Sequence, residues 1–436
     1  MRIKTSSTGL RVLTSLSLTI ASAWSATASA GGIMLYEVGQ EGAGLANAGA
    51  AVLATDPSVL MNNPAGISEL EGTQINASGQ LVIGHIKFSG DANSDFAGNN
   101  GDNALDYLPG ASFFISHQID DKSSIGFGMY GNFGLAVKYD DDWAGRYFTQ
   151  NAAVIGLSLE PVYSYKVDEK LSLGIGPRIM YAYYRTEAAV DNNVLGLGSG
   201  RSDGRLEYED TDIGVGLNMG ALYHLNERMD IGLAYTSKVD LDFEDRPTFD
   251  NINNPLLNTA LQTANISSLE LAMQVPQTLL LSTSYILDPQ WKLLSSLGWQ
   301  DWSQFGDIGV EVEADADAGS VTTGVDRKYK DTWHASLGAQ YQASRQLRWS
   351  MGIGYDSSMV DDQDRTVDNP AGDAWRFAGG LNYAVDDSLK LHAAYTLVWL
   401  GDMDLSQSKS RSGETLSGSY DSTALHIVGG GAVWRF

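Results

Sequence analysis

Apolar and polar residues alternate with a period of two along much of the chain, most clearly in its C-terminal half. In 346–357 the odd positions are large and apolar while the even positions are small or polar, as in Leu347-Arg-Trp-Ser-Met351. The same split recurs over 332–341, 375–383 and 389–397. Because successive side chains of a strand point to opposite faces, the pattern predicts many strands that each have one apolar face.

The connections between these strands alternate in length, and this alternation distinguishes a membrane barrel from a soluble β-sandwich. Six short turns are predicted near 120, 168, 226, 288, 344 and 386. Seven long polar loops are predicted at 90–105, 139–150, 188–206, 242–265, 314–327, 357–373 and 401–420. A soluble sandwich also alternates, but this wiring, with aromatic residues near strand ends such as Tyr181 and Trp299, is typical of a bacterial outer-membrane barrel. We therefore predict an all-β transmembrane β-barrel of about 14 antiparallel strands over residues 73–436.

Residues 1–30 have the composition of a secretory signal peptide. Three basic residues precede or begin an apolar stretch that runs to Ala23, and Ala28-Ser-Ala30 supplies a small-residue cleavage pattern. The alternative, a membrane anchor, needs a longer apolar run to cross a bilayer of about 30 Å. We therefore predict export of the mature chain to the outer membrane of a Gram-negative bacterium.

Composition narrows the classes of function. The chain has no Cys, which excludes disulfides and thiolate chemistry. Its 53 acidic and 28 basic residues give a net charge of −25, which argues against binding to nucleic acid. The six His residues lack the spacing of a metal or hydrolase motif, so no metal, no cofactor and no catalytic residue is predicted. An outer-membrane phospholipase with Ser and His on neighbouring strands stays an alternative, as does a structural or adhesin role.

Residues 31–72 lie before the first predicted strand and do not alternate. The segment is rich in Gly and Ala but also contains apolar residues such as Leu35, Val52 and Leu60. This apolar content is too high for a disordered tail to be the default. We predict a plug folded inside the barrel, whose lumen at about fourteen strands is wide enough to hold one.

Several motifs, each weak alone, follow one another along the chain in a recognisable order. They include Gly31-Gly-Ile-Met-Leu-Tyr-Glu37, Asn63-Pro64-Ala65, Leu233-Ala-Tyr-Thr-Ser237, Asp288-Pro-Gln-Trp291, Trp302-Ser-Gln-Phe305 and the terminal Phe436. In this order the chain resembles, over 31–436, the FadL family of outer-membrane long-chain fatty-acid transporters, which also includes aromatic-hydrocarbon transporters. The resemblance implies that 31–72 is an N-terminal hatch. It also implies passive uptake of hydrophobic molecules, with long-chain fatty acids as the first hypothesis and aromatic or aliphatic hydrocarbons as the alternative.

The expected partners are the hydrophobic ligand, outer-membrane lipid and lipopolysaccharide, and we expect a monomer. Acidic runs such as Asp140–Asp142 are predicted to be solvated loop tips. The alternative is that they bridge divalent cations to lipopolysaccharide.

The resemblance also implies an outer substrate groove between long loops. Apolar residues do occur in two loops that are otherwise polar: Val194, Leu195 and Leu197 in one, and Leu256, Leu257 and Leu261, at helix-like spacing, in the other. Their alternative role is to pack the loops together over the barrel mouth.

An inner site for a carboxylate requires a cation that points into the lumen. Parity along the predicted strands places Arg178, Lys330 and Arg376 on the polar face. The alternative is that these are lumen charges paired with acidic residues.

Sideways exit, which the resemblance implies, requires an opening at a kinked third strand. This strand is predicted over 125–135, where the glycine parity changes between 128 and 131, as a bulge would cause. We predict the kink at Gly131, Asn132 and Gly134, with the hatch residues Asn63, Pro64 and Ala65 beneath it. The alternative reason for these glycines is close packing against the plug.

Overall fold

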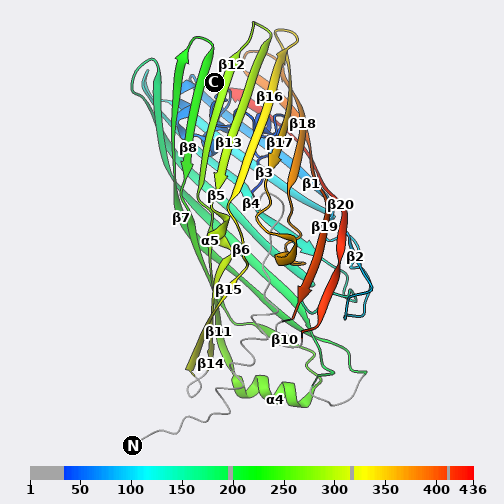
Figure 1. Ribbon diagram of the computed structural model, residues 1–436. Helices are drawn as coiled ribbons and strands as arrows, with labels where there is room; N and C mark the ends of the chain where they lie inside the picture. The colour runs from blue at the N-terminus through cyan, green and yellow to red at the C-terminus, as the bar shows by residue number, and fades with distance from the viewer. Residues whose placement is uncertain (1–33, 195–199, 315–318, 410–412) are drawn as a thin grey trace, which may run out of the picture.

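The computed structural model describes residues 34–194, 200–314, 319–409 and 413–436, so the predicted signal peptide lies outside the described residues. Its main feature is an antiparallel barrel, closed by pairing of the first strand with the last (Figure 1). Its fourteen strands are β1 (Thr73–His85), β3 (Tyr107–Gln118), β4 (Ser123–Lys138), β5 (Asn151–Lys166), β6 (Leu171–Val190), β7 (Gly204–Asn226), β8 (Met229–Thr236), β12 (Thr278–Ile286), β13 (Trp291–Gln300), β16 (Thr332–Gln342), β17 (Leu347–Asp356), β18 (Ala374–Ala384), β19 (Leu389–Ser408) and β20 (Thr415–Arg435). The predicted all-β barrel of 14 strands is confirmed.

The outer face of the barrel is apolar and its inner face is small or polar. On β6, for example, Leu173, Ile175 and Ile179 are exposed whereas the alternate residues are buried. This is the arrangement that lipid contact requires. Among the described residues, no helix is both long and apolar enough to span a bilayer.

All six predicted short turns connect neighbouring strands at one end of the barrel, at the top of Figure 1. Several predicted loops at the other end are wrong in extent, because strands continue through them. β6 continues to Val190 and β7 starts at Gly204. Likewise, β19 continues to Ser408 and β20 starts at Thr415. These extensions face water rather than lipid, so outward positions such as Arg185 and Arg205 are charged while inward Tyr184 and Leu206 stay buried. The polar outward residues gave the sequence the composition of a loop.

A second antiparallel sheet lies at the loop end, and part of it packs across the inner face of the barrel wall. It consists of β9 (Val239–Asp245), β11 (Ile266–Val275), β14 (Asp307–Ala314) and β15 (Gly319–Asp326). The backbone amides of Asp242 and Glu244 donate to the inward carboxylates of Asp212 and Asp210 on β7. Short elements complete this end: β2 (Phe88–Gly90), β10 (Thr248–Asp250), α4 (Pro255–Ala264), α5 (Trp302–Phe305) and the 3-10 turn Asp362–Asp364.

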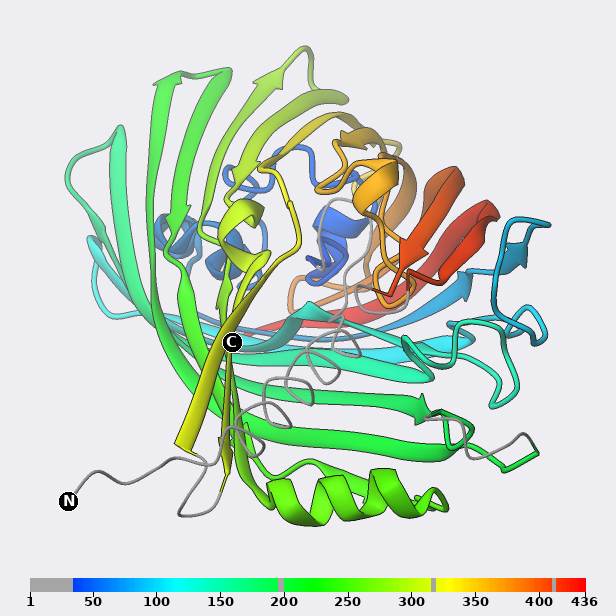
Figure 2. The ribbon, with the colours of Figure 1, turned by 60° about the horizontal axis from the view of Figure 1, so that its bottom comes forward.

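The segment 34–72 lies inside the barrel, as the view from the loop end shows (Figure 2). It forms α2 (Gln40–Ala43), α3 (Val59–Asn62) and a 3-10 helix, η1 (Pro64–Glu69). Val59, Leu60 and Ile67 pack with Phe114 and Val162 of the wall in an apolar cluster. The segment is therefore folded and packed on the wall.

Glycines on the wall let the segment approach closely. A Cβ at Gly174 of β6 would lie 2.2 Å from the backbone nitrogen of Ala65 and 2.3 Å from the carbonyl carbon of Pro64. Only a residue without a side chain fits there, since backbone atoms cannot turn away as a flexible side chain does.

We expect Gly174→Ala to loosen the segment from the wall by about 1–3 kcal/mol, the usual cost of overpacking. Limited proteolysis of the folded barrel should then cut within 34–72 faster than in the parent protein. Gly79→Ala is the matched control, because a Cβ there meets its nearest atom at 3.7 Å. Equal resistance of both variants would show that the close approach does not hold the segment.

Candidate functional site

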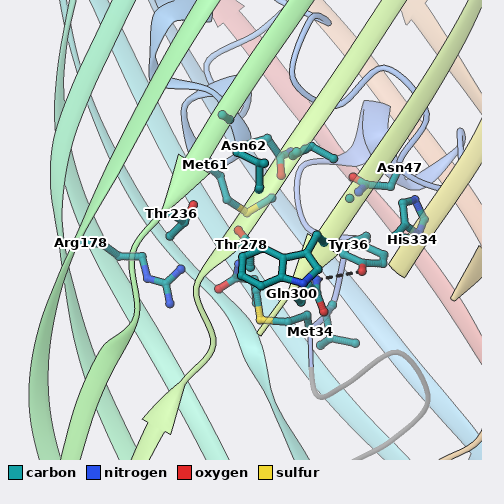
Figure 3. A pocket seen from close by; sticks show the side chains of 17 residues that line it. Met34, Tyr36, Asn47, Met61, Asn62, Arg178, Thr236, Thr278, Gln300 and His334 are labelled. Atoms are coloured by element: carbon teal, nitrogen blue, oxygen red, sulfur yellow. Dashed lines mark hydrogen bonds between the residues drawn. The ribbon is translucent and has the colours of Figure 1, made fainter. Parts of the chain in front are cut away.

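A cavity of about 50 Å³ lies between the N-terminal segment and the barrel wall. Figure 3 shows Arg178 at one side, Tyr36 and His334 at the other, and Met34 and Met61 between them. The wall contributes residues of β4, β6, β8, β12, β13 and β16. A buried water needs roughly 10–15 Å³, so the cavity has room for a few waters but not for an alkyl chain.

Arg178 is a buried cation without an ion-pair partner among the described residues. It lies on the inward face of β6, as parity predicted, and is 3% exposed. Its Nε and Nη2 atoms are buried and donate no hydrogen bond within the described chain. A buried guanidinium without hydrogen-bond partners carries a desolvation cost.

A polar cluster that the sequence analysis missed lies beside Arg178. Glu160 of β5 accepts a hydrogen bond from the hydroxyl of Tyr130 and a second one, of 2.7 Å, from Nδ2 of Asn218. Asn218 also donates to the carbonyl oxygens of Leu60 and Met61 at 3.2 Å. Each Glu160 oxygen thus accepts a hydrogen bond from a neutral donor. Arg178 lies close enough for a Coulombic attraction to Glu160, but the two form no ion pair in the described chain. The only feature of the sequence that could have indicated this cluster was the position of Glu160 on the inward face of its strand.

The predicted kink in the third barrel strand is present as a bulge in β4. The pairing of β4 with β5 shifts register between Tyr130 and Phe133, and Gly134 has φ +153°. Beyond the bulge the burial parity changes, so that Phe133, Leu135 and Val137 point inward.

The bulge coincides with a break in the hydrogen-bond ladder between β3 and β4, which is called the window below. The β3–β4 ladder stops at the pair Ser112↔Tyr130, although β3 stays paired with β1 as far as Tyr107. Beyond the break, the amide of Lys138 at the end of β4 donates to the carbonyl of Ala104, which precedes β3, at 2.8 Å. Residues 105–111 and 131–137 therefore face each other without ladder hydrogen bonds in the described chain. Asn132, at the bulge, also lines the cavity that Arg178 lines.

The triplet Asn63-Pro64-Ala65 makes its hydrogen bonds to the barrel wall on strands other than the kinked one. Asn63 Nδ2 donates to the carbonyls of Ala51 and Ala221 at 2.7 and 3.0 Å, and its Oδ1 accepts from the amide of Ala65. The carbonyl of Ala65 accepts from Ser164 Oγ of β5 at 3.0 Å. The triplet thus packs on β5, β6 and β7 near the short-turn end.

The N-terminal residues Met34 and Leu35 contact the kink instead. The amide of Leu35 donates to the carbonyl of Asn132 at 2.8 Å, and Met34 forms an isolated bridge with Phe133. Their position followed from no local pattern, because the contact is made across the lumen.

The other two predicted cations differ from Arg178. Arg376 is buried on the inward face of β18, but its Nη1 and Nε each lie 2.6 Å from a carboxylate, Glu37 and Asp356 respectively. Lys330 was wrongly placed on a strand: β16 begins only at Thr332, and Nζ of Lys330 pairs with Asp361 at 2.5 Å on the exposed loop surface. Parity has no meaning outside a strand, which explains the error.

His334, Asp356 and Ser336 are arranged like a hydrolase triad. Nδ1 of His334 lies 2.7 Å from Asp356 Oδ1, and its Nε2 lies 3.0 Å from Ser336 Oγ. Ser336 is 4% exposed and does not line the described cavity, and Asp356 also binds Arg376. Without access to its hydroxyl, the arrangement offers no nucleophile to a substrate. No group of three or more metal-binding side chains occurs in the described part of the chain.

The two loops expected to form the outer groove do lie together. Nδ2 of Asn254 donates to the carbonyl of Val194 at 2.9 Å, and Oδ1 of Asn192 accepts from the amide of Asn254 at 3.2 Å. These two buried asparagines were not predicted from the sequence, although Asn254-Pro255 is a recognisable helix start. Leu195 and Leu197 lie outside the described residues.

Helix α4 confirms the helix-like spacing of the leucines in the second loop. Leu261 lines an open groove of about 700 Å³ with Phe249, Ile252 and Ile266. Leu257 is half-buried, and Leu256 is 51% exposed away from this groove. The helix therefore presents apolar surface both to the groove and to solvent.

The closed barrel, with its apolar outer face, its short turns at one end and its long loops at the other, defines an outer-membrane β-barrel protein. Residues 21–436 match the family model described as outer membrane protein transport protein (OMPP1/FadL/TodX), and the chain belongs to this family. The protein is thus located in the outer membrane of a Gram-negative bacterium.

Named relatives cover most of the chain. It is 28% identical over 405 residues to outer membrane protein P1 of Haemophilus influenzae, covering 84% of this chain and 86% of the relative. It is 26% identical over 422 residues to the long-chain fatty acid transport protein of Escherichia coli O6:H1, with 91% and 92% covered.

Two solved structures show the same fold. A Pseudomonas aeruginosa FadL homologue superposes with a TM-score of 0.83 at 20% identity, covering 93% of this chain and 99% of the homologue. The Ralstonia pickettii toluene transporter TbuX gives 0.67 at 16% identity, with 92% and 99% covered.

Proposed function

We propose that the protein takes up long-chain fatty acids passively across the outer membrane. The observation that carries this proposal is the unpaired guanidinium of Arg178 in the cavity between segment and wall. A ligand carboxylate there gains charge-assisted hydrogen bonds, worth about 1.5–3 kcal/mol. A hydrocarbon gains nothing from Arg178 and leaves its charge buried. Relatives named as fatty acid transporters support the same choice.

In this proposal residues 31–72 act as a hatch. The described part of the segment, from residue 34, packs on β5, β6 and β7 through η1 and reaches the β4 bulge through Leu35. Because the cavity holds only a few waters, passage of an alkyl chain requires residues around Met34 to move.

The ligand leaves sideways through the window between β3 and β4 in this scheme. Asn132 supports this route, since it belongs both to the bulge and to the lining of the Arg178 cavity. Sideways exit avoids carrying the alkyl chain through the packed hatch toward the short-turn end. The alkyl chain of the ligand then enters the outer leaflet of the membrane.

The groove at α4 is the proposed outer site, where a ligand is collected before it enters the lumen. Withdrawal of alkyl groups from water is worth about 0.8 kcal/mol per CH₂, so partial burial at successive sites avoids one deep trap. Its apolar lining at Phe249, Ile252 and Leu261 supports this role.

We expect the double variant Leu257→Asp with Leu261→Asp to slow oleate uptake about tenfold at limiting concentration, through loss of roughly 1.4 kcal/mol of apolar contact. The amount of folded barrel, measured by heat-modifiable electrophoretic mobility, should stay unchanged. Thr259→Asp with Thr263→Asp is the control: it adds the same charge to exposed positions of α4 outside the groove lining. Unchanged uptake in the leucine variant would remove the groove from the pathway.

Binding to the purified protein tests the proposal directly. Titration with oleate, oleyl alcohol and toluene should show the tightest binding for oleate, because only oleate carries a carboxylate for Arg178. The second candidate, uptake of aromatic or aliphatic hydrocarbons by the same route, predicts equal or tighter binding of toluene.

A further inference from the structure

Arg376 lies at the centre of a buried charge cluster built from two parts of the chain. The wall supplies Asp356 on β17, and the N-terminal segment supplies Glu37. All three side chains are at most 3% exposed. The guanidinium of Arg376 also lies over the ring of Tyr36, 4.6 Å from its centroid. The cluster therefore ties residues 36–37 to the barrel wall.

Glu37 is the less completely satisfied carboxylate of the two. Its Oε1 contacts Arg376 at 2.6 Å, while its Oε2 is buried and accepts no hydrogen bond in the described chain. Asp356, in contrast, binds Arg376 with one oxygen, and its other oxygen contacts His334 at 2.7 Å. A buried, half-satisfied carboxylate carries a desolvation cost, so Glu37 is the partner of Arg376 that is more readily exchanged.

Tyr36 separates this cluster from the cavity. Its ring lines the cavity and lies tilted against the ring of His334, with 4.7 Å between the ring centroids. Its hydroxyl accepts a hydrogen bond of 3.0 Å from Gln300. Arg376 lies directly behind the ring. Movement of residues 34–37 away from the wall would therefore connect the Arg178 cavity with Arg376.

We propose that Arg376 is a second carboxylate subsite, which Glu37 occupies as an internal carboxylate until a fatty acid displaces it. The inference rests on the proposed function. Exchange of one carboxylate for another keeps the charge of Arg376 compensated, and it frees residues 34–37 from the wall. A ligand without a carboxylate cannot make this exchange. The ligand class that opens the cavity is therefore the long-chain carboxylate.

Glu37→Gln tests the exchange, because glutamine keeps the size of the side chain but removes the competing charge. We expect oleate to bind about tenfold more tightly to this variant, while binding of oleyl alcohol, which has the same chain length, changes less than twofold. In an Arg376→Met background the same substitution should leave oleate binding unchanged. An equal gain for both ligands would mean that Glu37 is only a structural tie, and would overturn the inference.

A labelling experiment that keeps both charged residues covers the case in which these variants do not fold. The chain has no Cys, so Met34→Cys introduces a single thiol at a position that is 8% exposed. Oleate should accelerate its reaction with a maleimide severalfold, and oleyl alcohol should not. Ala48→Cys, at a fully buried position of the same segment, should stay protected with either ligand. Equal acceleration by both ligands would contradict the exchange.

The two proposals fail in different ways. If the parent protein binds no oleate, the proposed function is wrong. If it binds oleate but neither experiment separates oleate from oleyl alcohol, the function stands and only the subsite at Arg376 is refuted.

Discussion

A reversible disulfide across the wall window, made by Ala111→Cys with Gly131→Cys, is expected to stop oleate uptake when oxidised and to restore it when reduced. These positions would form the next pair after Ser112↔Tyr130 if the β3–β4 ladder continued. A disulfide needs the separation that opposite residues of an antiparallel ladder have, so its formation draws β3 and β4 together beyond their last pair. The bridge would thus close the window, which is the proposed exit route of every ligand molecule.

The chain offers favourable conditions for this test. It has no Cys of its own, and a side chain at Gly131 meets no atom closer than 3.6 Å. Thr283→Cys with Ser295→Cys is the control, because these residues are paired across the intact β12–β13 ladder. Its oxidation should not affect uptake. Uptake that continues through the oxidised window variant would rule out lateral exit between β3 and β4.

Arg178→Met is expected to weaken oleate binding by about tenfold to a hundredfold, the equivalent of losing a charge-assisted hydrogen bond of roughly 1.5–3 kcal/mol. Met fills similar space without charge. Removal of an unpaired buried cation should not destabilise the barrel. Titration calorimetry with oleate and with oleyl alcohol measures the effect, and the alcohol should bind the variant at least as well as the parent protein.

Arg376→Met makes an informative contrast with Arg178→Met. It leaves Glu37 and Asp356 buried without their cation, so a loss of folded protein is expected, on the scale of about 3–5 kcal/mol for a broken buried pair. If Arg178→Met reduced the binding of oleate and oleyl alcohol equally, Arg178 would be part of the packing and not a carboxylate ligand.

The barrel wall could be predicted from the sequence because its signals are local. Each lipid-facing strand alternates over about ten residues, and each short turn contains polar turn residues between two strands. The same locality predicted the β4 bulge, because a bulge changes parity within one strand. The strand extensions of β6 and β7 were missed because their outward face is in water, where charged residues such as Arg185 replace apolar ones.

The interior could be predicted only in part. Parity gave the inward direction of Arg178 and Arg376, but not their partners, since Glu37 lies 339 residues from Arg376 in the chain. The segment 34–72 has no period that would fix which residue meets which strand. The strands that the triplet Asn63-Pro64-Ala65 contacts could therefore not be predicted, and the contact of Leu35 with the bulge was missed. Such contacts depend on the closed shape of the barrel.

Uptake of labelled oleate and labelled toluene, measured side by side in cells that lack their own transporter, with and without this protein, tests the central claim most directly. A carboxylate site at Arg178 on a path to the β4 window predicts stimulation of oleate uptake and no stimulation of toluene uptake. Stimulation of toluene alone would contradict the claim, because the pathway would then serve ligands that Arg178 cannot bind.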